Sequence, residues 1–338
     1  MMGALLAAAT WARVLSIVRT LLSLLAIAAV LSSAAPHAAA QGYPNGPITL
    51  VIPLGPGDAT DTTGRMMAEE LAKLLKVPVV PVNRPGAGMV IGTDSVVKAK
   101  KDGYTILITP NASLVSARIL NPESVTYDPI KDLTPLGLTT RTPILLAVRE
   151  DAPYRNFGEM VDFSKKHPGK VRAGTVGTGS VGHLNIEMIN SLTGAGVTMV
   201  PFKGGAPGIT ALLGGHVEGG AFSLGSLSSH LKSGAMRGMV ISNSFPGFSE
   251  IPTLTQLGHR QNLLGVWFAF FAPAGVPAEV TKTLVTAIET VAKDPAIAAK
   301  LASFGILQDY APPDKIVAEI REEHRIVAAL AKKAGLVK

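Results

Sequence analysis

The amino-acid sequence predicts an α/β protein built as two lobes with a closing set of helices. Short apolar runs alternate with helical patterns, which is typical of mostly parallel sheets flanked by helices. The alternation occurs twice, in residues 48–109 and again in residues 143–242. A helical part follows, in which prolines mark the helix starts and glycines the helix ends. The length of 338 residues is sufficient for two such units.

The two sets contain eight expected strands, each bounded by turn residues. They occupy residues 48–53, 77–82, 104–109, 143–149, 170–176, 197–202, 217–222 and 236–242. The helix after the first strand places Met67, Leu71, Leu74 and Leu75 on one face. The later helices are expected over residues 156–169, 182–194, 207–215, 276–294, 295–305 and 312–335. In the last of these, the spacing of Ile316, Ile320, Val327 and Ala331 predicts a face packed on a core.

The first 40 residues have the layout of a secretory signal peptide. Arg13 and Arg19 precede a short apolar stretch, and small residues at Ala38 and Ala40 follow it. An uncleaved membrane anchor is the alternative, but the apolar stretch is shorter than the roughly 20 residues that a span needs. We therefore expect export, with cleavage near Ala40.

Composition excludes several classes of function. There is no cysteine, so disulfides and thiol nucleophiles are absent. The net charge is +7, but no run of Lys and Arg is long enough to predict a nucleic-acid partner. The seven histidines lack metal-ligand spacing. We expect no metal, no cofactor and no catalysis.

Three glycine-rich loops each join an expected strand to an expected helix, where free backbone N–H groups favour an anion. The first, residues 54–60, contains Asp58. Asp58 or Thr60 could simply cap the helix, and Asp58 could also face a ligand. The third loop, "FKGGAPG" at residues 202–208, places Lys203 where it could neutralise a carboxylate.

The second loop, "GTGSVG" at residues 177–182, matches a dinucleotide-binding fingerprint. That fingerprint needs an acidic residue about 20 positions later, and this chain has Lys203 there instead. A serine hydrolase is also disfavoured, because Thr178 stands where the nucleophile elbow needs glycine. Ser180 and His183 are more consistent with helix capping and packing, or with binding of a carboxylate.

Several segments in order resemble the periplasmic solute receptors of tripartite tricarboxylate transporters, the Bug or TctC-like proteins. The matching stretches are "YPNGPITLVIPLGPGDATD", "VNRPGAGMVIGTDSVVKAKKDGYTIL", "YDPIKDLTPLGL", "GTGSVGHL", "VPFKGGAPGITALLGGHVE", "HLKSGAMRGMVIS", "IPTLTQLG" and "WFAFFAPAGVP". The resemblance implies a two-lobed periplasmic-binding-protein (Venus-flytrap) fold, with each lobe a mostly parallel sheet. Residues 43–143 and 266–338 would form the first lobe, and residues 144–265 the second.

The resemblance also implies a function. The protein would capture a small organic acid between its lobes and deliver it to membrane permease subunits, acting as a monomer. The implied ligand contacts come from the three loops, the turn after the third strand and the end of the strand at 217–222. They are Leu54, Pro56, Gly57, Asp58, Ala59, Thr60, Asn111, Ser113, Thr178, Gly179, Ser180, Val181, His183, Phe202, Lys203, Gly204, Phe222 and Ser223.

The sequence departs from the family pattern at Asp58, where a glycine is usual, and at Phe222, where an acid is usual. An ionised Asp58 would repel a carboxylate at short range. One alternative is therefore the same receptor with an amine- or amide-bearing ligand. A second alternative is a receptor that serves a signalling partner instead of a permease.

Overall fold

The structure, a computed structural model, describes residues 42–337. The predicted signal peptide and its cleavage near Ala40 lie outside the described residues. The chain divides into a short unit, residues 1–45, and a large unit, residues 46–338. All the strands and helices described below belong to the large unit.

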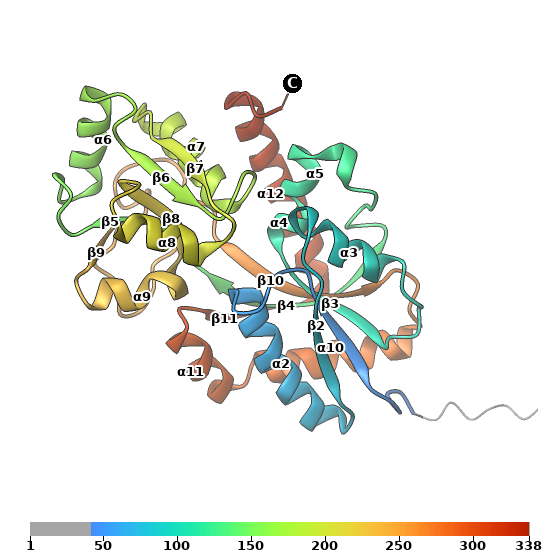
Figure 1. Ribbon diagram of the computed structural model, residues 1–338. Coiled ribbons are helices and arrows are strands. Elements are labelled where there is room, and N and C mark those ends of the chain that lie inside the picture. Colours follow the sequence, from blue (N-terminus) through green and yellow to red (C-terminus); the bar gives the residue numbers. More distant parts are fainter. Residues whose placement is uncertain (1–41, 338) are drawn as a thin grey trace, which may run out of the picture. The chain divides into compact units, whose positions relative to one another are not determined.

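The first sheet has six strands in the order β11-β4-β10-β3-β1-β2 (Figure 1). Its strands are β1 (Ile48–Ile52), β2 (Val79–Asn83), β3 (Thr105–Pro110), β4 (Leu133–Thr142), β10 (Val266–Pro273) and β11 (Leu307–Ala311). Its helices are α2 (Ala59–Leu75), α3 (Val90–Val97), α4 (Asn111–Leu114), α5 (Ser116–Leu120), α10 (Ala278–Ala292), α11 (Pro295–Ser303) and α12 (Pro313–Lys333), with short 3₁₀ turns at Ala87–Met89 and Pro122–Ser124. Helices α2 and α10 cover one face of this sheet, and α3 and α12 cover the other.

The second sheet has five strands in the order β7-β6-β8-β5-β9. They are β5 (Ile144–Arg149), β6 (Arg172–Thr175), β7 (Thr198–Pro201), β8 (Gly219–Ser223) and β9 (Met236–Ile241). The helices of this part are α6 (Phe157–Lys166), α7 (Val181–Thr193), α8 (Gly205–Leu213) and α9 (Leu224–Lys232). The α/β class and the eight predicted strands are confirmed, with small shifts at their ends.

Both sheets are mixed, which corrects the expectation of mostly parallel sheets. β1 pairs in parallel with β2 and β3, but β10 runs antiparallel to both β3 and β4. In the second sheet, β5 is likewise antiparallel to β8 and β9. The sequence pattern missed β4, β10 and β11. A proline and a glycine interrupt β4 and polar residues dominate β11, whereas β10 is a continuous apolar run that lies outside the two strand–helix sets.

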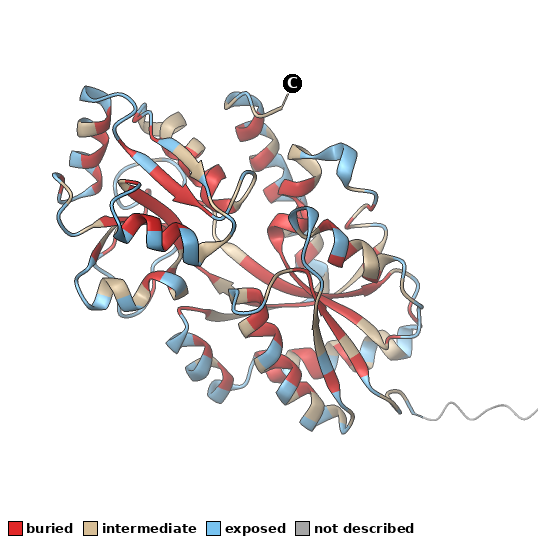
Figure 2. Ribbon diagram, viewed as in Figure 1, coloured by how far each residue is buried: buried red, intermediate tan, exposed pale blue. Residues whose placement is uncertain are grey.

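Alternation along β5 shows how one strand supports two cores. Leu146 and Val148 belong to one buried cluster, whereas Leu145 and Ala147 belong to another. Successive side chains of a strand point to opposite faces, so a fully apolar strand is buried on both. Figure 2 shows this burial concentrated in the strands and on the inner faces of the helices.

The terminal helix packs as predicted, since Ile316, Ile320, Val327 and Ala331 are all buried. The prediction for α2 is only partly right. Met67 and Leu71 are buried, but Leu74 is 45% exposed because it lies near the end of the helix, beyond the sheet.

The chain leaves the first sheet after β4 and enters the second at β5, passing through Pro143. It returns between β9 and β10, and side-chain amides fix the returning segment. Asn185 on α7 accepts the Leu264 N–H at 2.7 Å and donates to the Leu264 carbonyl at 2.8 Å. The Asn111 amide donates to the Gly265 carbonyl at 3.1 Å.

A buried carboxylate lies beside this returning segment. Glu323 on α12 accepts hydrogen bonds from the Trp267 indole and from the Asn111 amide, both at 2.7 Å. Burial raises the pKa of Glu323 to about 7, although those two donors and Arg141 favour the charged form. Glu319, one turn earlier on the same helix, adds to the increase.

We predict that Glu323→Gln changes the pH dependence of stability. A raised carboxyl pKa means that the folded state holds the proton more tightly than the unfolded state. The free energy of unfolding of the natural protein should therefore fall as the pH rises from 4.5 to about 7. The Glu323→Gln variant lacks this titration, so the difference between the two proteins should change by roughly 3 kcal/mol across the window.

Urea unfolding at several pH values between 5 and 8 measures this difference. Glu322→Gln is the matched control, since Glu322 is exposed on the same helix and its carboxyl pKa is lowered by Arg325. Parallel pH profiles for the natural protein and the Glu323→Gln variant would contradict the prediction.

Candidate ligand-binding site

In the loop between β1 and α2, the structure shows what the Asp58 side chain contacts. Asp58 is the N-cap of α2, and its Oδ1 accepts a hydrogen bond from the Thr60 N–H at 2.8 Å. Its backbone is extended, with φ −69° and ψ 158°, as a capping residue requires. The Thr60 N–H therefore already has an acceptor and is not free to bind an anion.

Asp61 accepts a hydrogen bond from a second backbone N–H group of the same loop. Its Oδ2 accepts the Gly57 N–H at 2.9 Å, while its Oδ1 accepts from Arg65 and Asn83. Asn83 also donates to the Leu54 carbonyl at 2.9 Å, which ties the loop to the end of β2. Burial alone would raise the pKa of Asp61, but the donors around it hold that pKa below its usual value.

Asp58 lies at the protein surface, and neighbouring atoms partly desolvate its carboxyl group. This desolvation raises the pKa of Asp58, against the opposing effect of the hydrogen bonds from Thr60. A second carboxylate placed against this side chain would add a like charge beside it.

Side chains also accept hydrogen bonds from two backbone N–H groups at the start of α7. Ser180 caps the helix by accepting the His183 N–H at 3.2 Å, and its hydroxyl donates to the Gly177 carbonyl at 2.8 Å. His183 in turn accepts the Gly179 N–H on its Nδ1 at 3.0 Å. Burial lowers the pKa of His183, so the neutral ring that this contact needs is favoured. Ser180 and His183 thus hold the loop in place and do not form a catalytic pair.

The start of α8 is different. Its N-cap, Gly204, has φ 116° and supplies no side-chain cap, so the N–H groups of Gly205 and Ala206 have no acceptor among residues 42–337. Lys203 is exposed immediately before this helix start. Backbone donors, the positive end of a helix dipole and a cation therefore lie next to one another.

The predicted ligand contacts separate into two groups by burial. Those at or near the surface are Leu54, Pro56, Gly57, Asp58, Ala59, Thr178, Gly179, Ser180, Phe202, Lys203, Gly204 and Ser223. Those in the interior are Thr60, Asn111, Ser113, Val181, His183 and Phe222.

The side chains of the interior group make contacts within the protein. The Ser113 hydroxyl bonds to the Thr109 hydroxyl at 2.5 Å and to the Pro110 carbonyl at 3.0 Å. Asn111 holds Glu323 and Gly265, as described above. The Phe222 ring fills the space over Gly174, Gly208 and Gly220, so it contributes to core packing at the strand end.

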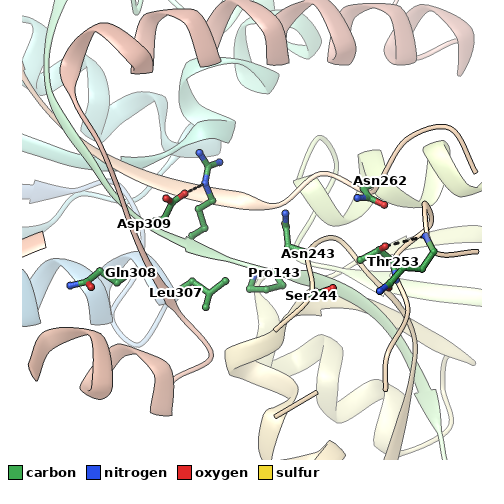
Figure 3. Close-up of a pocket in the computed structure, with 10 residues that line it drawn as sticks. Pro143, Asn243, Ser244, Thr253, Asn262, Leu307, Gln308 and Asp309 are labelled. Carbon is green, nitrogen blue, oxygen red and sulfur yellow. Dashed lines mark hydrogen bonds and ion pairs between the residues drawn. The ribbon is translucent and has the colours of Figure 1, made fainter. Parts of the chain in front are cut away.

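Sequence reasoning missed a cavity of about 540 Å³ beside the crossing at Pro143 (Figure 3). Its lining includes Arg141, Asn243, Asn262 and Asp309, and none of the predicted contacts. No loop motif marks these residues, because they meet only when β4, β11 and the segment after β9 come together. Among residues 42–337, no cluster of acidic residues and histidines is suited to a metal ion.

The family comparison decides how this arrangement is to be understood. The model of the family described as "Tripartite tricarboxylate transporter family receptor" (TctC) matches residues 63–336. The chain belongs to this family. The predicted resemblance is confirmed, and the protein is a solute-binding receptor and not an enzyme. None of the helices in the described part of this receptor is long and apolar enough to cross a membrane.

Among its relatives, the receptor is 30% identical to the protein BugT of Bordetella pertussis over 317 residues, which covers 93% of this chain and 97% of BugT. The solved periplasmic binding protein BugD superposes with a TM-score of 0.76 at 28% identity, covering 87% of this chain and 99% of BugD. The two-lobed periplasmic-binding-protein fold is thereby confirmed.

Two solved relatives contain ligands. Rpa4515 of R. palustris, solved with adipate, has a TM-score of 0.80 at 28% identity and covers 87% of this chain and 98% of its own. MatC of Rhodopseudomonas palustris, solved with malate, has a TM-score of 0.75 at 27% identity and covers 85% of this chain and 99% of its own.

We predict that Asp58→Ala lowers the free energy of unfolding by about 1 kcal/mol, because the Thr60 N–H loses its acceptor. Asp58→Asn is the matched control, since its amide oxygen can still accept that hydrogen bond. Urea unfolding followed by circular dichroism measures both. Equal losses in the two variants would show that the cap is not the stabilising interaction.

Proposed function

We propose that the protein is an extracytoplasmic receptor that captures a small organic acid and delivers it to a tripartite tricarboxylate-type permease. Family membership and the two relatives solved with adipate and malate support a carboxylate ligand. The observation in this chain that supports it best is the uncapped start of α8 beside Lys203. We further propose export by the predicted signal peptide and action as a monomer.

The ligand carboxylate is placed at this helix start for a physical reason. At the starts of α2 and α7, backbone N–H groups already donate to Asp58, Asp61 and His183. At the start of α8, the N–H groups of Gly205 and Ala206 have no such partner in the described part of the chain. An anion at a helix start gains hydrogen bonds and a favourable dipole interaction together. We therefore assign the α8 start as the main anion contact.

The other end of the ligand would face Asp58. Because this carboxyl group is exposed and already caps α2, it favours a hydrogen-bond donor over a second carboxylate. We propose a monocarboxylate that carries a hydroxyl, amide or amine group at its far end. This extends the alternative of an amine- or amide-bearing ligand and remains compatible with the receptor role.

We propose that the lobes divide as expected, with residues 43–143 and 266–338 in one and residues 144–265 in the other. The change of sheet after β4 and the return before β10 support this division. A ligand that contacts both lobes would favour a closed state by its differential affinity for that state. The permease would then distinguish the loaded receptor from the empty one.

Lys203→Gln should weaken binding of a small carboxylate about three- to tenfold, because one exposed positive charge beside the anion is lost. Lys203→Arg retains the charge and serves as the control. Isothermal titration of both variants with a panel of mono- and dicarboxylates, neutral amides and amines provides the test. Binding of neutral or cationic compounds alone would refute the carboxylate proposal.

Asp58→Gly should improve binding of dicarboxylates such as malate by about tenfold, because it frees the Thr60 N–H and removes a like charge. Asp58→Asn removes the charge and keeps the cap, so it separates the two effects. The same titrations measure both variants. Unchanged dicarboxylate affinity in Asp58→Gly, with unchanged affinity for amines, would show that Asp58 does not face the ligand.

A further inference from the structure

The cavity beside Pro143 has features that the proposed carboxylate site does not use. Its volume of about 540 Å³ lies in the range typical of small-molecule sites. One wall comes from β4 and β11, through Arg141, Gln308 and Asp309. The facing wall comes from the segment between β9 and β10, through Asn243, Gln256 and Asn262 (Figure 3).

The three amides of that segment share one orientation. The Gln256 Oε1 accepts the Thr253 N–H at 2.8 Å, and the Asn262 Oδ1 accepts the Thr255 N–H at 2.8 Å. A backbone N–H can only donate, so each amide oxygen must face its partner and each NH₂ group must face away.

For Asn243, a serine hydroxyl is the partner of the amide oxygen. The Ser242 hydroxyl accepts the Ile144 N–H at 3.2 Å and donates to the Asn243 Oδ1 at 3.0 Å. Figure 3 shows the Asn243 side-chain nitrogen directed into the space between Asp309 and Asn262. Within the described part of the chain, the NH₂ groups of Asn243, Gln256 and Asn262 have no acceptor.

The opposite wall is rich in acceptors. Asp309 pairs with the Arg141 Nε through its Oδ2, which leaves its Oδ1 without a donor among residues 42–337. Glu319 holds the other two nitrogens of Arg141, at 2.6 and 2.8 Å. Two carboxylates therefore surround a single guanidinium, and Asp309 is the one of the two that lines the cavity.

An occupant of this cavity must satisfy both walls. A simple carboxylate would suit the amide wall but would be repelled by Asp309, and a simple amine would offer the NH₂ groups no acceptor. A dipolar molecule matches both. We propose that this cavity is a second solute site that binds a zwitterionic amino acid, with its carboxylate on Asn243, Gln256 and Asn262 and its ammonium group on Asp309.

This second site, the hinge cavity, is separate from the carboxylate site proposed at the α8 start, since the two share no residue. Its walls belong to the two places where the chain passes between the sheets. An amino acid bound there would contact both passages, and any preference for one lobe arrangement would change the affinity of the main ligand by the same factor in both directions.

The test uses the full exported protein and a series of probes of increasing length. Glycine, β-alanine and γ-aminobutyrate are titrated by calorimetry, with butyrate and butylamine as the separate halves of the longest probe. Because the proposed main site also takes small carboxylates, the titrations are made on the natural protein and on Lys203→Gln. We expect saturable binding of at least one amino acid that persists in Lys203→Gln, and no such Lys203-independent binding of either half. Absence of this Lys203-independent binding, or equal Lys203-independent binding of butyrate, would overturn the proposal.

Matched variants locate the site. Asn262→Asp and Gln256→Glu keep the oxygen that holds the Thr255 or Thr253 N–H, but each replaces the NH₂ donor with a negative acceptor. Each should weaken amino-acid binding by about tenfold or more. Asp309→Asn should weaken it similarly by removing the charge that holds the ammonium group.

Lys203→Gln distinguishes this site from the proposed main site. It should leave amino-acid binding at the hinge cavity unchanged while weakening carboxylate binding at the α8 start. Loss of amino-acid binding in Lys203→Gln, with no loss in Asn262→Asp, would place the amino acid at the α8 start and overturn the proposal. Urea unfolding of each variant checks that the fold is intact.

Discussion

The hydrogen bond from the Thr60 N–H to the Asp58 carboxylate illustrates the constraint on which the binding side of this receptor depends. The first N–H groups of a helix have no partner within that helix, so a side chain, water or a ligand must satisfy them. Helices α2 and α7 use their own side chains, namely Asp58 and Ser180. Helix α8 begins at glycine and has no side-chain cap, so its first N–H groups are open to an anion.

Polar contacts fix the segment that returns from the second sheet to the first. Asn185 holds Leu264 through both of its amide atoms, and Asn111 joins Gly265 to Glu323. Such contacts are directional, so a displaced partner leaves a buried donor or acceptor unsatisfied. The crossing segments can therefore adopt few arrangements, which is what a receptor that alternates between open and closed states requires.

The two proposed sites differ in polarity for reasons that can be traced to single residues. Lys203 and the free N–H groups at the α8 start give a site of positive potential. Asp309 offers a free carboxylate oxygen in the hinge cavity, while the facing amides supply donors. The two proposed sites therefore differ in charge, one suited to an anion and the other to a dipolar molecule.

The sequence alone determined the α/β class, the eight strands with regular apolar runs and the family, because these depend on local pattern and on motifs in order. It could not decide whether Asp58 caps α2 or faces outward, since both fit the same letters. It also could not show that Asn111, Ser113 and Phe222, which we expect near the ligand, are buried. Only the tertiary structure brings Asn243, Asn262 and Asp309 together. Burial and side-chain direction depend on which distant segments pack against a residue, and no local pattern contains that information.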